Sequence, residues 1–256
     1  MDLLIKSLVG FVVGGLIGMT GVGGGVLLLP ILIFGLHVPP LRAVGSDALF
    51  NFLTKIGASA VHLRRGTVRR KVVLALIVGS APGSYLGVNL LHHLRKVHGN
   101  GVNHFITFAV GVLLVVIPGF LFFQKKIEDR AAVRPPTIKS FAWMGLIGLI
   151  AGFLVGITSV GSGSIVMMLL LLFYSFQPKV MVGTDIVHAL LLTGVTSFLH
   201  YEINHNIDLH LVGALLLGSV PGGLLGSYLS TRVPVPWLRR ILCAVLLATG
   251  ARMLMA

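Results

Sequence analysis

Charged residues are scarce in this chain, and acidic residues are the scarcest of them. Of 256 residues only 7 are Asp or Glu and 11% are charged, whereas 55% are hydrophobic. The mean hydropathy is +0.98. Soluble domains carry about 25% charged residues, so this composition excludes an ordinary water-soluble domain. The apolar runs are continuous rather than alternating with period two, which excludes a membrane β-barrel and predicts an all-α polytopic membrane protein.

Cysteine is almost absent as well. The chain's one cysteine, Cys243, lies inside an apolar run, which excludes a disulfide framework and a cysteine-based metal site. We expect neither a metal nor a cofactor. The first apolar run continues far beyond the length of a signal-peptide core, so we treat it as a structural segment.

Basic residues outnumber acidic ones by a wide margin. The 20 Lys and Arg residues give a formal net charge of +13. In a soluble protein this charge would suggest nucleic acid as a partner, but here the basic residues lie in short loops between apolar runs, and no nucleic-acid motif accompanies them. The pattern is typical of a multi-pass protein in a lipid bilayer. It leaves open whether the chain forms a homo-oligomer.

The apolar sequence divides into ten segments. They lie at 3–19, 24–36, 43–62, 72–92, 102–123, 139–157, 162–176, 182–200, 209–230 and 236–255. A spanning helix needs about 20 residues, so the run from Leu3 to Leu36 is too long for one span and its halves are short for two. A helix, a glycine-rich break at Gly18–Gly25 and a second helix fit best. Such a hairpin begins and ends on one side of the membrane, whether it crosses fully or is re-entrant.

An internal duplication relates the two halves of the chain. A basic connection at 124–138 separates a first half, 1–123, from a second half, 139–256. Offsets of 138 and 139 residues relate short motifs in the same order in both halves. The matching pairs are GMTGVGGG at Gly18 with GITSVGSG at Gly156, VGSD at Val44 with VGTD at Val182, and GSAPG at Gly79 with GSVPG at Gly218. We therefore interpret each half as one membrane repeat.

Loop charges indicate how these repeats are oriented. Five segments per half place the halves in opposite orientations, whereas four would make them parallel. With five segments, fourteen Lys and Arg residues collect on one side and five on the other. The equivalent loops 62–71 and 201–208 carry five basic residues and none. We predict two inverted repeats of about five segments each, with both termini outside and a cytoplasmic linker.

The glycine-rich breaks are the first candidate sites, because polar backbone inside apolar sequence is costly unless it lines something. A break exposes the N–H groups of the helix that follows, and these groups attract anions. The candidate substrate-binding residues here are Thr20, Gly21, Gly23, Gly24, Gly25, Thr158, Ser159, Gly161, Ser162, Gly163 and Ser164. The alternative is that the breaks only form turns, just as Gly10, Gly14 and Gly18 only allow close helix packing.

A polar stripe runs along the third segment, formed by Asp47, Asn51, Lys55 and His62. Helical spacing places these residues within about 80° of arc. A charge at mid-membrane costs about 2.5 to 3.5 kcal/mol, so the stripe should not face lipid. We expect Lys55 and Asn51 to bind an anion.

The equivalent segment of the second half carries its own polar face, with Asp185, His188, Thr196 and His200. Candidates for proton coupling are Asp47, Asp185, His188, His62 and His200. Two alternatives stay open. The pairs Ser46-Asp47 and Thr184-Asp185 could instead cap helices that begin after glycine, and the histidines His62 and His200 could simply face water.

Taken together, these motifs resemble those of the sulfite exporter TauE/SafE family of bacterial membrane permeases. The similarity rests on GMTGVGGG and GITSVGSG, on VGSD and VGTD, on the histidines that close the next helix, and on GSAPG and GSVPG. The resemblance implies a secondary transporter of small, often sulfur-containing anions such as sulfite or organosulfonates. It also implies a place in the bacterial inner membrane. Ser159 and Ser162 replace Gly21 and Gly24 of the first copy, which makes the second break more polar.

The leading hypothesis is an exporter that moves a small anion by alternating access, and not an enzyme. A second hypothesis is an intramembrane serine hydrolase using Ser162 or Ser164 with His200, although neither serine lies in a GxSxG motif. A third is a membrane assembly subunit that transports nothing. The paired polar breaks favour transport over both alternatives.

Overall fold

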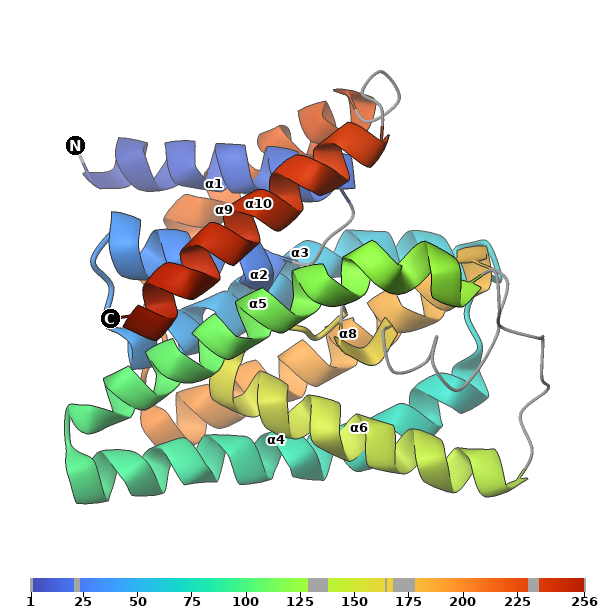
Figure 1. Ribbon diagram of the computed structural model, residues 1–256, viewed down its shortest axis with the longest axis horizontal. Coiled ribbons are helices and arrows are strands. Elements are labelled where there is room, and N and C mark those ends of the chain that lie inside the picture. Colours follow the sequence, from blue (N-terminus) through green and yellow to red (C-terminus); the bar gives the residue numbers. More distant parts are fainter. Residues whose placement is uncertain are drawn as a thin grey trace.

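The computed structural model describes residues 2–20, 24–128, 138–163, 165–167, 178–229 and 235–255. These residues are almost entirely helical, with no strand among them, which confirms the predicted all-α class. The elements are α1 (Asp2–Thr20), α2 (Gly24–Pro30), the π-helical turn η1 (Ile31–Gly35), α3 (Pro40–Arg64), α4 (Arg70–His98), α5 (Gly101–Glu128), α6 (Ile138–Thr158), α8 (Pro178–Leu199), the π-helical turn η2 (His200–Asn204), α9 (Leu209–Leu229) and α10 (Val235–Met255) (Figure 1).

Helices occupy the predicted apolar segments in order. Most of the predicted segment 162–176 lies outside the described residues, as does 129–137 of the linker. Proline marks the start of two helices, because a residue at the first helical position needs no hydrogen-bonded N–H. Pro40 begins α3 and Pro178 begins α8. The helix-cap interpretation of Ser46-Asp47 and Thr184-Asp185 is therefore wrong, since both pairs lie inside helices.

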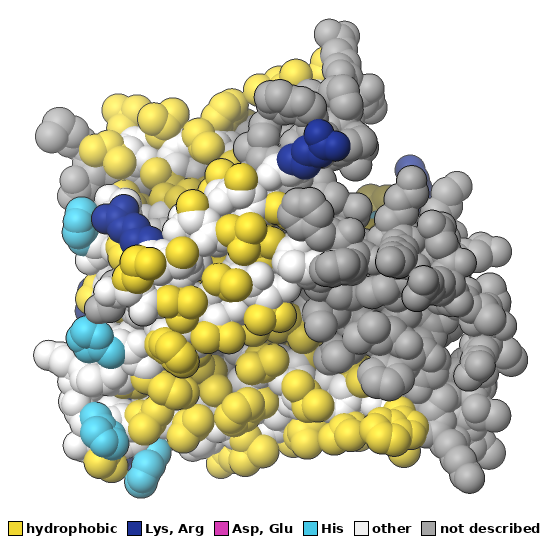
Figure 2. All heavy atoms as spheres, in the orientation of Figure 1, with side chains coloured by type: hydrophobic (Ala, Val, Ile, Leu, Met, Phe, Trp, Pro, Cys, Tyr) yellow, Lys and Arg dark blue, Asp and Glu magenta, His cyan; other side chains and the backbone are white. Residues whose placement is uncertain are grey.

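The helices suit a membrane. Five of the described ones, α4, α5, α6, α8 with η2, and α9, are long and apolar enough to cross a bilayer, and α1, α2 with η1, and α10 contain shorter apolar stretches. Large apolar side chains such as Leu4, Val78 and Leu224 are exposed on their outer faces. Figure 2 shows such side chains covering much of the described part of one face. The chain is thus a multi-pass membrane protein, and the first half of α3 is buried among its helices whereas the second half is largely exposed.

Glycines on α1 let it pack directly on the backbone of α9. A Cβ added at Gly10 would strike the Leu215 carbonyl, and one at Gly14 would strike Ser219. Gly18 lies in the same way against Gly223. The packing interpretation of these three glycines is therefore confirmed.

The same contact occurs between α6 and α4. Here Gly148, Gly152 and Gly156 lie against the backbone of Leu76, Ser80 and Ser84. These residues are the repeat equivalents of the α1 and α9 pairs at offsets of 138 and 139. The first helix of each half thus packs on the fourth helix of the other. In Figure 1, α1 runs from left to right and its equivalent α6 from right to left, and α5 and α10 also run oppositely.

Loops also dock across the halves, and this docking explains part of the VGSD and VGTD motifs. The backbone N–H of Asp208 donates to Ser46 Oγ over 3.0 Å, and a Cβ at Gly45 would lie 2.6 Å from Asn206 Oδ1. In the other half, Arg69 N donates to Thr184 Oγ1, also over 3.0 Å. The VGSD motif therefore binds the loop after His200, and the VGTD motif binds the loop after His62. The aspartate of each motif takes no part in these two hydrogen bonds.

Candidate functional site

The two glycine-rich breaks and the two central helices meet inside the bundle. Helix α3 packs against α8, and the first break leads into α2 beside α3. A Cβ added at Gly25 would lie 2.7 Å from Asp47 Oδ2 and 2.8 Å from the carbonyl oxygen of Ser159. Only a glycine fits where the first break, the stripe of α3 and the second break come together.

The second break is a compact turn. Helix α6 ends at Thr158, whose hydroxyl donates to the Leu154 carbonyl over 2.7 Å and accepts a hydrogen bond from Val160 N. Positive φ angles follow at Ser159, 55°, and at Gly161, 87°. The left-handed region is unfavourable for a serine, so this turn is held by its surroundings. Ser162 is buried in the same turn.

Asp47 is held by the second break. Ser159 Oγ donates to Asp47 Oδ2 over 2.7 Å, which links α3 to the turn after α6. Asp47 is fully buried, and its Oδ1 has no hydrogen-bond partner among the described residues. A buried carboxylate oxygen without a donor calls for a proton or a bound ligand.

Asn51 and Lys55 continue the stripe. Lys55 Nζ donates to Asn51 Oδ1 over 2.8 Å, and Asn51 Nδ2 donates to the carbonyl of Asp47 over 3.0 Å. Gly24 lies beside this pair, since a Cβ there would be 2.9 Å from Asn51 Oδ1. The predicted stripe is thus brought together with Gly24 and Gly25.

A second carboxylate lies at the equivalent place of the other half. A Cβ added at Gly163 would lie 2.9 Å from Asp185 Oδ2, as Gly25 lies against Asp47. Asp185 Oδ1 also lacks a hydrogen-bond partner among the described residues. The Lys55 ammonium interacts electrostatically with both Asp47 and Asp185. Lys55 is partly buried, and its charge favours the ionised form of both carboxylates.

Two serines of α4 complete the surroundings of α8. Ser80 Oγ lies 2.9 Å from His188 Nε2, and Ser84 Oγ lies 2.8 Å from Thr196 Oγ1. His188 is fully buried, and its Nδ1 has no partner within the described part of the chain. Neither serine is among the predicted site residues, although the sequence GSAPGS at 79–84 contains both.

His62 and His200, the histidines at the ends of the two central helices, differ in their surroundings. His200 is fully buried, so the water-facing interpretation is wrong for it. Its Nε2 lies 3.0 Å from the Gly156 carbonyl, which can only accept, and its Nδ1 lies 3.2 Å from Asn206 Nδ2. These contacts assign the proton to Nε2. His62 is partly exposed at the end of α3, with Nδ1 2.9 Å from Thr67 Oγ1.

Three predicted site residues, Gly21, Gly23 and Ser164, lie outside the described residues, and the side chain of Thr20 does too.

The described geometry also bears on the hydrolase hypothesis. Both ring nitrogens of His200 contact groups other than serine hydroxyls. The ring is therefore not oriented as a base toward Ser162.

Comparisons with known proteins agree with this architecture. The family described as "Sulfite exporter TauE/SafE" matches residues 7–253. The chain is 35% identical over 250 residues to the probable membrane transporter protein YjnA of Bacillus subtilis, covering 96% of this chain and 98% of that protein. It is 24% identical over 273 residues to the probable membrane transporter protein YunE of the same organism, covering 99% and 98%.

No solved structure matches the chain. Both relatives are named as transporters rather than as enzymes or assembly subunits. From the match over nearly its whole length, the chain belongs to the sulfite exporter TauE/SafE family of membrane transporters.

Proposed function

We propose that the protein is a secondary transporter that exports small anions such as sulfite or organosulfonates across the bacterial inner membrane by alternating access. The observation that carries the proposal is the polar stripe of α3, formed by the buried Asp47 and Asn51 and the partly buried Lys55, at the meeting point of two glycine-rich breaks. Intramembrane charges are expensive and mark transport pathways. The anion and the direction of transport follow the family description.

Lys55 supplies the countercharge for the anion. Its ammonium carries three N–H donors, and the structure commits one of them to Asn51. The second N–H of the Asn51 amide and the hydroxyl of Ser162 provide further donors around the breaks. The hydroxyls of Thr158 and Ser159 donate to Leu154 and Asp47 in this structure and would turn toward a bound anion. The glycines at 24, 25, 161 and 163 allow the backbone to come close to a substrate, and Thr20, Gly21, Gly23 and Ser164 complete the proposed set.

Asp47 and Asp185 couple binding to protons in this proposal. With both carboxylates ionised, the net charge of the two aspartates and Lys55 is negative and repels an anion. Protonation of one or both carboxylates removes this repulsion, and each carboxylate already has an oxygen with no described donor. The histidines are secondary candidates for the coupled proton. His200 and His62 contact loop residues, and His188 contacts Ser80 of α4.

Alternating access needs two states, and inverted repeats would supply them. The inverted arrangement of 1–123 and 139–256, joined by the linker 124–138, is supported by the exchanged packing of α1 on α9 and α6 on α4. It is supported also by the opposite directions of equivalent helices (Figure 1). A cysteine near each terminus should react with an impermeant reagent from outside; reaction from the cytoplasmic side would contradict this topology.

Flux of labelled sulfite in proteoliposomes tests the proposal. Lys55→Ala should abolish saturable flux, whereas the matched control Lys71→Ala, an exposed lysine at the start of α4, should not. Size-exclusion profiles and thermal unfolding should show that both variants fold. Absence of flux for every small anion tried with the wild-type protein would contradict the proposal.

A further inference from the structure

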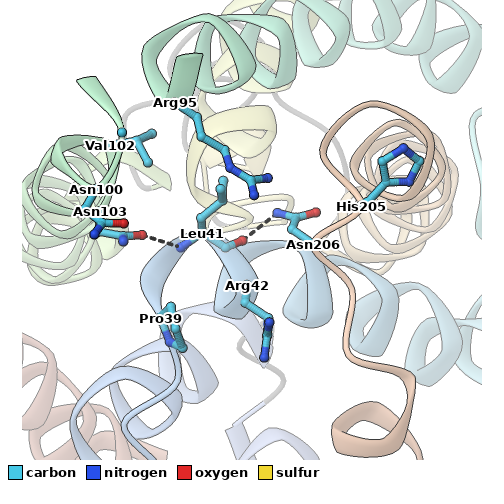
Figure 3. Close-up of a pocket in the computed structure, with 10 residues that line it drawn as sticks. Pro39, Leu41, Arg42, Arg95, Asn100, Val102, Asn103, His205 and Asn206 are labelled. Atoms are coloured by element: carbon cyan, nitrogen blue, oxygen red, sulfur yellow. Dashed lines mark hydrogen bonds between the residues drawn. The ribbon is translucent and has the colours of Figure 1, made fainter. Parts of the chain in front are cut away.

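A polar pocket of about 400 Å³ opens at one end of the bundle, away from the central stripe. It lies where α3 and α5 begin, where α4 ends, and beside the loop that follows η2 (Figure 3). Arg42 lies 13 residues before Lys55 on α3, which is about 20 Å along a helix. The pocket is therefore separate from the site formed by the glycine-rich breaks.

The lining of the pocket is cationic. It contains Arg42 and Arg95, and no Asp or Glu is among the lining residues. Asn100, Asn103 and His205 add polar groups. Asp208 lies in the loop between η2 and α9 but is not a lining residue. Its Oδ1 accepts a hydrogen bond from Leu211 N at the start of α9. Arginine binds oxyanions with two parallel N–H donors, which makes this lining suitable for such a ligand.

Hydrogen bonds hold the pocket in shape. Leu41 N donates to Asn103 Oδ1 over 3.2 Å, and Asn206 Nδ2 donates to the Leu41 carbonyl over 2.6 Å (Figure 3). Arg95 Nη1 donates to the Asn204 carbonyl over 3.1 Å, which orients its guanidinium and leaves further N–H groups for a ligand. Arg42 is exposed, and its side chain forms no hydrogen bond within the described part of the chain.

The duplication does not account for these arginines. Loop docking is the same in both halves, yet the repeat equivalent of Arg42 is Val180. The docked loop therefore does not require a cation at this position. In Figure 2, histidine side chains gather along the left edge, the same end of the molecule at which α4 ends and α5 begins. Arg42 and Arg95 therefore give this end a positive charge that the packing of helices does not explain.

We propose that the pocket is a second anion site, a vestibule that holds a free small oxyanion at Arg95 before or after its passage through the central site, while Arg42, whose side chain points away from Arg95 in Figure 3, adds positive charge to the lining. The identity of the anion rests on the proposed function, and sulfite is the expected ligand. The volume is large enough for a small oxyanion together with water molecules. On the predicted topology this vestibule opens on the outer face.

A fluorophore at the pocket rim tests this site without transport. His98→Cys, beside the lining residue Gly99, is exposed and can be labelled, because the chain's only cysteine, Cys243, is buried. The purified, labelled protein in detergent is titrated with sodium sulfite at constant ionic strength. A saturable response is expected. Arg42→Gln should raise the sulfite concentration at half-saturation at least threefold, and the double variant Arg42→Gln with Arg95→Gln should raise it at least tenfold. Lys96→Gln, which changes the exposed neighbour of Arg95, should leave this concentration unchanged.

Parallel measurements separate the two proposals. Lys55→Ala should keep the pocket response while losing flux, because the sites are distinct. A pocket response in a wild-type protein without flux would contradict the proposed function and leave the vestibule standing. Wild-type flux with no pocket response, or an equal response to chloride, would overturn the vestibule. A response to short-chain phosphatidylglycerol but not to sulfite would assign the pocket to a lipid headgroup and would overturn it too.

Discussion

The central helices α3 and α8 are repeat equivalents with the same carboxylate and different partners for it. Asp47 and Asp185 occupy matching places against Gly25 and Gly163. The position of Lys55, however, is taken on α8 by Thr193, which donates to the carbonyl of Ala189 in its own helix over 2.7 Å. The two halves thus share the framework of the site and its carboxylates, whereas its positive charge comes from the first half alone.

The largest effect should come from making the two helices alike. Lys55→Thr copies the α8 residue into α3 and removes an ammonium group that interacts electrostatically with both carboxylates. We expect sulfite flux to fall about 100-fold, since a hydrogen bond from a charged group contributes about 1.5 to 3 kcal/mol. Adding Thr193→Lys should not restore flux, because α8 has alanine where α3 has Asn51. Full recovery in the double variant would show that the two helices are interchangeable.

The glycine contacts should respond equally in both halves. Gly14→Ala and Gly152→Ala each place a methyl group against backbone of the partner helix. Overpacking typically costs about 1 to 3 kcal/mol, so both variants should unfold at lower temperature in detergent. Gly57→Ala is the matched control, because nothing lies within 4 Å of a Cβ there. Loss of stability in only one of the two packing variants would contradict equivalent roles.

The closing histidines should respond unequally. His200→Ala removes two buried contacts, with Gly156 and Asn206, and a net hydrogen bond contributes about 1 kcal/mol. We expect roughly 2 kcal/mol of destabilisation for it and less than half of that for His62→Ala, whose ring is partly exposed. Thermal unfolding of both variants measures the difference. Equal losses would show that His62 is as deeply integrated as His200.

A smaller effect is expected at the second break. Ser159→Ala removes the hydroxyl donor to Asp47 and corresponds to the glycine found at position 21 of the first copy. We expect flux to fall about fivefold to tenfold, which corresponds to roughly 1 to 1.4 kcal/mol. The pH dependence of flux should also shift if Asp47 carries the coupled proton. An unchanged pH profile would separate Ser159 from the coupling step.

The sequence predicted the helical architecture well, because long apolar runs and glycine-rich interruptions determine it locally. The stripe of Asp47, Asn51 and Lys55 was predictable for the same reason, since helical spacing places these residues on one face. The hydrogen bonds from Ser80 to His188 and from Ser159 to Asp47 were not, because they join helices far apart in the chain. The pocket at Arg42 depends on four separate segments, and no local pattern signals it.

The exchanged glycine contacts bear on the origin of this chain. Gly14 packs on Ser219 and Gly152 packs on Ser80, so the glycine-lined face of each half is covered by the other half and not by its own helices. A chain containing one repeat alone would leave that face open. If the matching motifs reflect duplication of a gene of that length, its product would have needed to associate in pairs to cover this face.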